Sequence, residues 1–192
     1  YDYDRGEILI DGVNIKDYSS KELRNSVGLV LQDPFLYHGT VESNIKMYNE
    51  SLTREDVIEA AKFVDAHNFI DKLEDKYDSL VTERGSTFSS GERQLLTFAR
   101  TIASKPKILI LDEATANIDS ETEELIQNSL EKMRKGRTTI AIAHRLSTIQ
   151  DSNCIYVLDK GEIIESGTHD ELIALKGNYY KMYQLQAGML NK

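Results

Sequence analysis

Two neighbouring carboxylates, Asp112 and Glu113, follow the apolar run ILIL in this chain of 192 residues. Adjacent residues of a strand point to opposite faces, so the two side chains can take different tasks. One can bind a metal ion while the other addresses a water molecule. A hard cation such as Mg²⁺ takes oxygen ligands and usually keeps substrate phosphates as partners. A helix cap or a solvated strand end is the plainer interpretation, but the position after ILIL and before Ala-Thr favours the chemical one.

Two further apolar stretches end in a polar side chain. Gln32 ends the first of them and His144 ends the second. Taken alone, Gln32 is an amide that a loop can satisfy, and His144 is a neutral histidine at a sheet edge. If the strands are parallel neighbours, however, these ends meet the Asp112 pair at one crevice. That placement favours contact between His144 and a substrate phosphate.

These side chains depend on a series of strands and helices that must position them. The stretches VGLVLQ (27–32), KILILDEAT (107–115) and RTTIAIAH (137–144) are predicted strands, and helical patterns separate them. Strands that alternate with helices predict an α/β fold with a largely parallel sheet. Hairpins are predicted at Asp11-Gly12 and at Asp159-Lys160-Gly161, which add an antiparallel β portion.

A helical block interrupts this alternation and predicts an inserted all-helical subdomain over residues 34–104. The core then consists of residues 1–33 and 105–192. One stretch of the insertion, from Thr53 to Leu73, has apolar residues close to a 3.6-residue spacing. Another, STFSSGERQLLTFAR (86–100), opens with small polar residues and one glycine before its apolar-spaced helix.

The composition is that of a globular protein with a sizeable core. Lys and Arg number 23 and Asp and Glu number 32, which gives a net charge of −9. An acidic chain is a poor candidate for nucleic-acid binding through its general field, although a local basic patch remains open. Cys154, in the run CIYVL, is predicted to be a core residue in a reducing compartment. No apolar run approaches the length of a membrane span.

Four motifs occur in order and cover essentially the whole chain: LVLQDPFL, FSSGERQ, ILILDEATANID and AIAHRLST. With them the chain resembles the nucleotide-binding domain of an ATP-binding cassette (ABC) transporter. The resemblance implies a P-loop NTPase-type (RecA-like) core. It also implies a role for each motif: Gln32 in the Q-loop, Ser86–Gln94 with the signature motif, Ile108–Asp112 as the Walker B strand, Glu113 as the catalytic carboxylate, Ala116–Asp119 as the D-loop with Asp119, and His144 as the switch histidine.

The signature helix of this family points its N-terminus at ATP held by the opposite subunit, where backbone N–H groups and the helix dipole favour phosphate. The resemblance gives Ser89, Ser90, Gly91 and Glu92 this role. The family pattern is LSGGQ, so Ser90 replaces a glycine and Glu92 replaces a glutamine. Both changes are expected to weaken that site, while Glu113 is intact. This combination favours one half of a heterodimeric multidrug-type exporter over a homodimer. An ordinary helix cap is an equally valid description of the same residues.

An exporter is also indicated by the stretch just before the signature. Exporter-type domains carry a similar acidic-Arg-Gly loop that contacts the coupling helices of the transmembrane domains, and Glu83, Arg84 and Gly85 match it. The stretch LYHGTVESNI (36–45) is also exporter-like. A plain turn before a helix remains an alternative for the first stretch taken alone.

The phosphate-binding run G-x-x-x-x-G-K-[ST] does not occur in the sequence, and the opening YDYDRGEILIDG suggests a piece cut from a longer chain. We therefore expect this chain alone to bind ATP weakly and to hydrolyse none. For the intact dimer the resemblance implies Mg²⁺-dependent ATP hydrolysis that drives export, with Asp112 and Gln32 at the Mg²⁺ ion. The partners would be a second nucleotide-binding domain and transmembrane domains at the cytoplasmic face of the membrane. A soluble ABC ATPase acting on DNA or ribosomes, and a non-hydrolysing regulatory subunit, are the alternatives.

Overall fold

A computed structural model describes residues 3–47, 49–82, 85, 87–112, 120–143 and 145–188, with the backbone alone at 120 and 121. The chain divides into two compact units, residues 1–140 and 141–192. Each unit is described by itself. The predicted division at 33/34 and 104/105 is a different one and stays a prediction.

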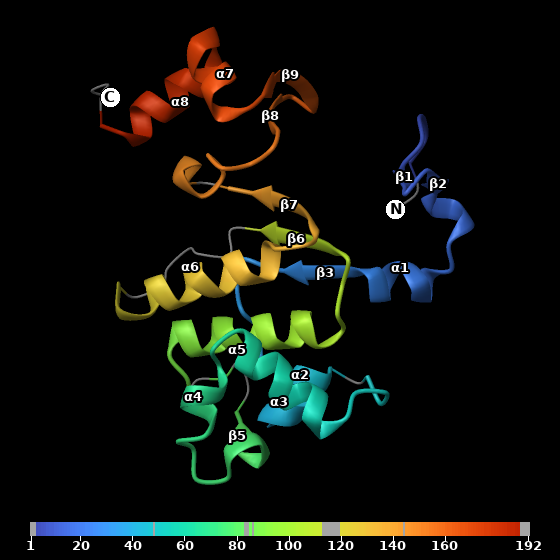
Figure 1. The fold of residues 1–192 in the computed structure, drawn as a ribbon, viewed down its shortest axis with the longest axis vertical. Coiled ribbons are helices and arrows are strands. Elements are labelled where there is room, and N and C mark those ends of the chain that lie inside the picture. The colour runs from blue at the N-terminus through green and yellow to red at the C-terminus, as the bar shows by residue number, and fades with distance from the viewer. Residues whose placement is uncertain are drawn as a thin grey trace. The chain divides into compact units, whose positions relative to one another are not determined.

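The first unit is built on a sheet whose strands run in the order β3-β6-β7 (Figure 1). They span Val27–Val30, Ile108–Asp112 and Thr138–Ile142. Strands β3 and β6 are parallel, with Val27 opposite Ile108 and Val30 opposite Leu111. The arrows of all three strands point the same way in Figure 1. The predicted α/β fold with a parallel sheet is confirmed.

The two faces of this sheet differ in burial. Val30 and Leu109 are fully buried, whereas Leu29 and Leu31 are half exposed, at 50% and 49%. The predicted strand in VGLVLQ is therefore buried on one face only. Alternating side chains point to opposite faces, and helix α5 packs against β3 on the buried one.

Among the described residues of the first unit, five α-helices follow β3 in the chain. Their bounds are α2 (Val41–Lys46), α3 (Arg54–Phe63), α4 (His67–Ile70), α5 (Ser90–Ala103) and α6 (Ser120–Arg134). The helical pattern from Thr53 to Leu73 breaks at Asp65, whose φ of 61° is left-handed. A short antiparallel pair, β4 (Gly39–Thr40) with β5 (Leu80–Val81), also lies in this region.

Before β3 the chain forms a hairpin and one short helix. Strands β1 (Leu9–Ile10) and β2 (Val13–Asn14) pair antiparallel around the predicted turn at Asp11-Gly12. A 3₁₀ turn, η1 (Ile15–Asp17), leads to α1 (Ser20–Ser26). A capping box starts α1, since Glu22 N–H donates to Ser19 Oγ and Ser19 N–H donates to the Glu22 carboxylate.

The described residues of the second unit form a 3₁₀ turn, η4 (Leu146–Thr148), and a hairpin that is followed by two α-helices. Strands β8 (Ile155–Asp159) and β9 (Glu162–Gly167) pair antiparallel around the predicted turn, and α7 (His169–Leu175) and α8 (Asn178–Gln186) follow. Its core includes Ile155, Val157 and Tyr179. The prediction that Cys154 is a core residue is wrong, because its thiol is exposed. Ile155 and Val157 take the inner face, which leaves Cys154 on the outer one.

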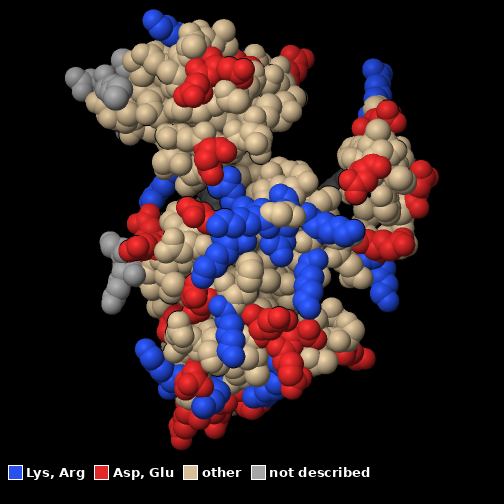
Figure 2. Space-filling view, in the orientation of Figure 1, with Lys and Arg blue, Asp and Glu red and all other residues tan. Residues whose placement is uncertain are grey.

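Charged side chains of both signs cover the surface, as expected for a chain with a net charge of −9. Lys and Arg side chains nevertheless gather in the middle of the face shown in Figure 2. Within the described part of the chain, none of the helices has the length and apolar character that a membrane span needs.

Candidate functional site

The structure brings two of the predicted site residues to one edge of the sheet. Val30 of β3 lies opposite Leu111 of β6 in a parallel register. Asp112 is therefore one residue beyond this pair, and Gln32 is two residues beyond it, at the carboxyl ends of neighbouring strands. This is the edge at which ligands bind in parallel sheets. The expected meeting of the two strand ends is thus observed for Gln32 and Asp112.

Both side chains are open to a further ligand. Asp112 is half-buried and Gln32 is exposed, and neither forms a hydrogen bond or ion pair with the residues that the structure describes. A carboxylate and an amide supply the oxygen atoms that Mg²⁺ prefers. Among the described residues no group of three His, Cys, Asp or Glu side chains could hold a metal by itself. The donors fit a metal ion whose remaining ligands come from a bound phosphate or water.

Several predicted site residues lie outside the residues that the structure describes. They are Glu113, Asp119, His144, Glu83 and Arg84. Their assignments, including the D-loop range, remain predictions.

The signature residues form the start of α5 through a capping box. Ser89 is the N-cap, and its hydroxyl oxygen accepts a hydrogen bond from Glu92 N–H at 3.2 Å. The Glu92 carboxylate accepts one from Ser89 N–H at 2.8 Å. The N–H groups of Ser90 and Gly91 have no partner within the helix, because helical hydrogen bonding begins later. Donors and the helix dipole are therefore available to an anion at this end.

The small size of Gly91 has a cause inside this chain that the sequence did not reveal. A Cβ atom on Gly91 would lie 2.7 Å from Cβ of Thr122 on α6, well inside van der Waals contact. Gly91 is itself buried. Packing of α5 against α6 therefore requires glycine here, whatever lies beyond the helix end.

The two exporter-like stretches contact each other. Gly85 has a left-handed φ of 62°, and a Cβ there would lie 2.7 Å from Leu36 Cδ1. Strand β4, in the stretch after Gln32, pairs with β5, which directly precedes Gly85's loop: Gly39 lies opposite Val81. Backbone pairing and side-chain packing thus hold the stretch before the signature against the stretch that follows Gln32.

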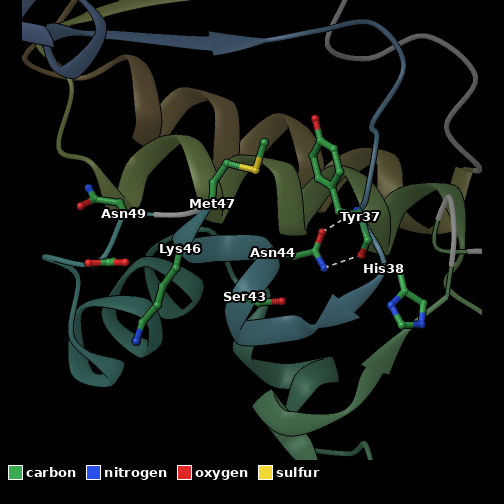
Figure 3. A pocket seen from close by; sticks show the side chains of 8 residues that line it. Tyr37, His38, Ser43, Asn44, Lys46, Met47 and Asn49 are labelled. Atoms are coloured by element: carbon green, nitrogen blue, oxygen red, sulfur yellow. Dashed lines mark hydrogen bonds between the residues drawn. The ribbon is translucent and has the colours of Figure 1, made fainter.

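An open pocket of about 310 Å³ lies beside this stretch. Its lining comes from one segment of chain: Tyr37, His38, Ser43, Asn44, Lys46, Met47, Asn49 and Glu50. Figure 3 shows Tyr37 and Met47 projecting to the same side of α2 and Lys46 pointing away. Phe35 and Tyr37, which pack edge to face with ring centroids 4.9 Å apart, are 46% and 40% exposed. The surface therefore carries apolar side chains where a partner could contact them.

Asn44 organises the wall of this pocket and was missed in the sequence analysis. Its amide is 2% exposed and fully bonded. Asn44 Oδ1 accepts from Tyr37 N–H at 2.8 Å, and Nδ2 donates to the carbonyls of Tyr37 and Thr40 at 2.8 and 3.0 Å. The available signal was its spacing, because Val41, Asn44 and Ile45 form the buried face of α2. A polar residue on such a face requires hydrogen-bond partners.

Comparisons with known proteins agree with this arrangement. The family model described as ABC transporter matches residues 1–116. A Streptococcus pneumoniae protein described as an ABC transporter ATP-binding protein is 69% identical over 190 residues, which are 99% of this chain and 32% of that protein. A Bacillus subtilis protein described as a multidrug resistance ABC transporter ATP-binding/permease protein is 53% identical over 188 residues, 98% of this chain and 28% of that protein.

A solved structure is also similar. The structure of a bacterial Atm1-family ABC exporter with ATP bound matches with a TM-score of 0.87 and 42% identity. The match covers 97% of this chain and 33% of that one. The chain thus spans about a third of the length of the proteins it resembles.

Proposed function

This chain belongs to the ABC transporter family, and we propose that it binds and hydrolyses Mg·ATP to drive export by a longer protein. The observation that carries the proposal is the meeting of Gln32 and Asp112 at one sheet edge, with neither side chain bonded within the described chain. The family match and the start of α5 support it.

Asp112 and Gln32 would hold Mg²⁺ together with phosphate oxygens of ATP. When bound, the ion would neutralise negative charge on the reacting phosphates. Glu113, which follows Asp112 in the sequence, would orient the attacking water and accept its proton. His144 would donate a hydrogen bond to the γ-phosphate. Each residue acts by position and charge, which dominate phosphoryl transfer.

A second nucleotide-binding domain would complete each ATP site through its own signature helix. The start of α5 in this chain would face ATP on that partner. Ser90 adds a side chain there and Glu92 adds negative charge, so this half-site would bind ATP less well than a regular one. With Glu113 intact, we propose a heterodimer in which the partner carries the stronger signature.

Transport would require contact with transmembrane domains at the cytoplasmic face of the membrane. We propose that their coupling helices contact the loop around Gly85 and the pocket walled by Asn44, in a helical subdomain of residues 34–104. The packing of Gly85 against Leu36 supports this assignment, because it holds the two exporter-like stretches side by side. The same stretch follows Gln32, so the pocket and the Mg·ATP site are close in sequence.

The test uses the full-length transporter in lipid nanodiscs with its native partner subunit. Glu113→Gln should abolish phosphate release while radiolabelled ATP stays bound after gel filtration, because ATP binding is kept and the general base is lost. Glu124→Gln on the exposed face of α6 is the matched control and should turn over normally. Unchanged phosphate release by Glu113→Gln would refute the catalytic assignment.

A second measurement concerns this chain alone. Calorimetry should show weak Mg·ATP binding by residues 1–192 and tight binding by the full-length protein, because the phosphate-binding run does not occur in these residues. Tight binding by residues 1–192 would mean that other groups hold the phosphates.

A further inference from the structure

Arg100 connects the signature helix to the segment that follows Gln32. It lies on α5, ten residues beyond Ser90, and its guanidinium is directed at loop backbone. Nε donates to the Asn44 carbonyl at 2.7 Å, and Nη1 donates to the Phe35 carbonyl at 2.9 Å. Nη2 donates to Asn44 Oδ1 at 3.1 Å. Three donors of one planar group thus bind one acceptor in the loop, the Phe35 carbonyl, and two acceptors of Asn44 on α2.

The contact is a closed network. Asn44 Oδ1 accepts from both Arg100 and Tyr37 N–H, while Nδ2 holds the carbonyls of Tyr37 and Thr40. The Arg100 guanidinium also lies over the Tyr37 ring, 5.6 Å from its centroid. Every polar atom of the Asn44 amide is therefore used, and a shift of α5 must move the loop with it.

The positive charge of Arg100 is not balanced by a neighbouring carboxylate among the described residues. Arg100 forms no ion pair with any carboxylate in the described part of the chain, and burial lowers the pKa of its guanidinium below the usual range. Taking a cation out of water without a counter-charge is costly. The planar guanidinium of Arg100 matches three acceptors at once, and the single ammonium group of a lysine cannot reproduce this geometry.

We propose that Arg100 is a positioning residue that keeps the Gln32 segment and the Asn44 pocket in register with the signature helix. The proposal rests on the proposed function, because it gives that register a task. A displacement of the pocket by the transmembrane part would pass through Asn44 and Arg100 to α5. A displacement of α5 on ATP-driven closure would pass the opposite way. Loss of the fork should uncouple these movements while ATP binding remains.

Arg137 offers a matched control. It is another half-buried arginine that donates to backbone carbonyls, from Nε to Pro106 at 3.0 Å and from Nη1 to Met133 at 2.8 Å. These carbonyls are remote in sequence from the Gln32 loop. Arg137→Lys removes the same kind of hydrogen bond without touching the network around Asn44. Both variants lose a guanidinium group, so a difference in their activity is due to the position of Arg100 in the structure.

The experiment compares Arg100→Lys and Arg137→Lys in the full-length transporter in nanodiscs. For Arg100→Lys we expect the kcat of phosphate release to fall about tenfold, since small displacements are costly in positioned reactions. The KM for ATP should stay within about twofold, because ground-state binding is kept. Arg137→Lys should change neither. An equal loss in both variants, or a rise in KM alone, would overturn the proposal.

Hydrogen exchange gives a readout independent of activity. Arg100→Lys should speed amide exchange in residues 33–47, and Arg137→Lys should leave that segment unchanged. Equal exchange there in all three proteins would overturn the proposal. If Arg100→Lys does not fold, Asn44→Asp replaces it, since it keeps the oxygen that accepts from Arg100 and Tyr37 N–H and removes the two bonds donated by Nδ2. Wild-type protein without Mg²⁺-dependent phosphate release would refute the proposed function, while the exchange result would still decide whether Arg100 holds the loop.

Discussion

Ser89 and Glu92 bond each other reciprocally at the start of α5. Glu92 Oε2 accepts from Ser89 N–H at 2.8 Å, and Ser89 Oγ accepts from Glu92 N–H at 3.2 Å. The carboxylate therefore lies at the helix end where a phosphate would be favoured. Ser19 and Glu22 form the same reciprocal pair of hydrogen bonds at the start of α1. Glu92, which departs from the family pattern, thus completes the capping box with the N-cap residue Ser89.

Removing this negative charge should strengthen ATP binding at the partner's site. Glu92→Gln keeps an oxygen that can accept from Ser89 N–H, so the helix start should be retained. We expect the KM for ATP of the full-length heterodimer to fall about two- to fivefold, the range of one charge at a helix end. Glu22→Gln is the matched control, because it changes the same cap far along the chain from the signature. Equal effects of both variants would mean that Glu92 acts on the cap alone.

Gly91 is expected to be intolerant of even one methyl group. Gly91→Ala places Cβ 2.7 Å from Thr122 Cβ, so α5 and α6 must separate. We expect a loss of about 1–3 kcal/mol in the free energy of unfolding, as for other overpacked cores. Chemical denaturation of the purified protein measures it.

A double-mutant cycle separates this packing effect from any loss of phosphate contact. Thr122→Gly removes the opposing side chain, so Gly91→Ala should destabilise much less in that background. If Gly91→Ala lowers the free energy of unfolding by the same amount with Thr122 and with Thr122→Gly, the contact with Thr122 is not the cause of the loss. ATP affinity measured on the same four proteins would then report the phosphate contact separately.

Asp112 should matter for turnover and hardly at all for stability. It has no bonded partner within the described chain, so Asp112→Asn should change the free energy of unfolding by less than about 0.5 kcal/mol. Mg²⁺-dependent phosphate release should fall by about a hundredfold or more, because a charged ligand is lost. A Mg²⁺ titration of ATPase activity checks both the loss and its rescue by excess metal. A large fall in melting temperature would instead indicate a structural role.

The pairing of Arg54 with Asp78 should give stability that disappears in acid. Arg54 donates from Nη1 and Nη2 to the two Asp78 oxygens at 2.8 and 2.9 Å, and these bonds hold the pKa of Asp78 below its usual range. A carboxyl group with a lowered folded-state pKa stabilises above its unfolded value, about 4, and the effect is lost as pH falls through the folded value.

Arg54→Met should therefore lower the melting temperature at pH 7 and have a smaller effect at about pH 2.5, because more of the Asp78 carboxyl is protonated at the lower pH. Thermal unfolding of the purified protein at the two pH values measures the difference. Lys72→Met, on an exposed side chain that forms no ion pair within the described part of the chain, serves as the reference. Arg54 also donates to Glu42, so an Arg54→Met effect of the same size at both pH values would exclude both carboxylates, Asp78 and Glu42, as its source.

Local features of this protein followed from the sequence because their partners are local. The turn at Asp11-Gly12 needs residues that accept positive φ, and the Ser19–Glu22 box closes over three residues. The strand around Leu109 was predicted from its continuous apolar run, and the strand around Val157 from the hairpin turn that follows it. The order of the motifs predicted the site, and Gln32 and Asp112 lie where the strand pattern placed them.

What the sequence could not supply is the identity of distant neighbours. Whether Cys154 faces inward depends on which side of β8 the core takes, and alternation alone leaves that choice open. From the sequence, Gly91 is explained by contact with phosphate, whereas the structure shows that it packs against Thr122. Arg100 reads as an ordinary helix residue, yet its acceptors lie 56 and 65 residues away. Backbone rules act within a few residues, so the sequence alone determined the elements and the motif chemistry; contacts between elements arise only on folding, so the tertiary structure decided which side chains hold the site in place.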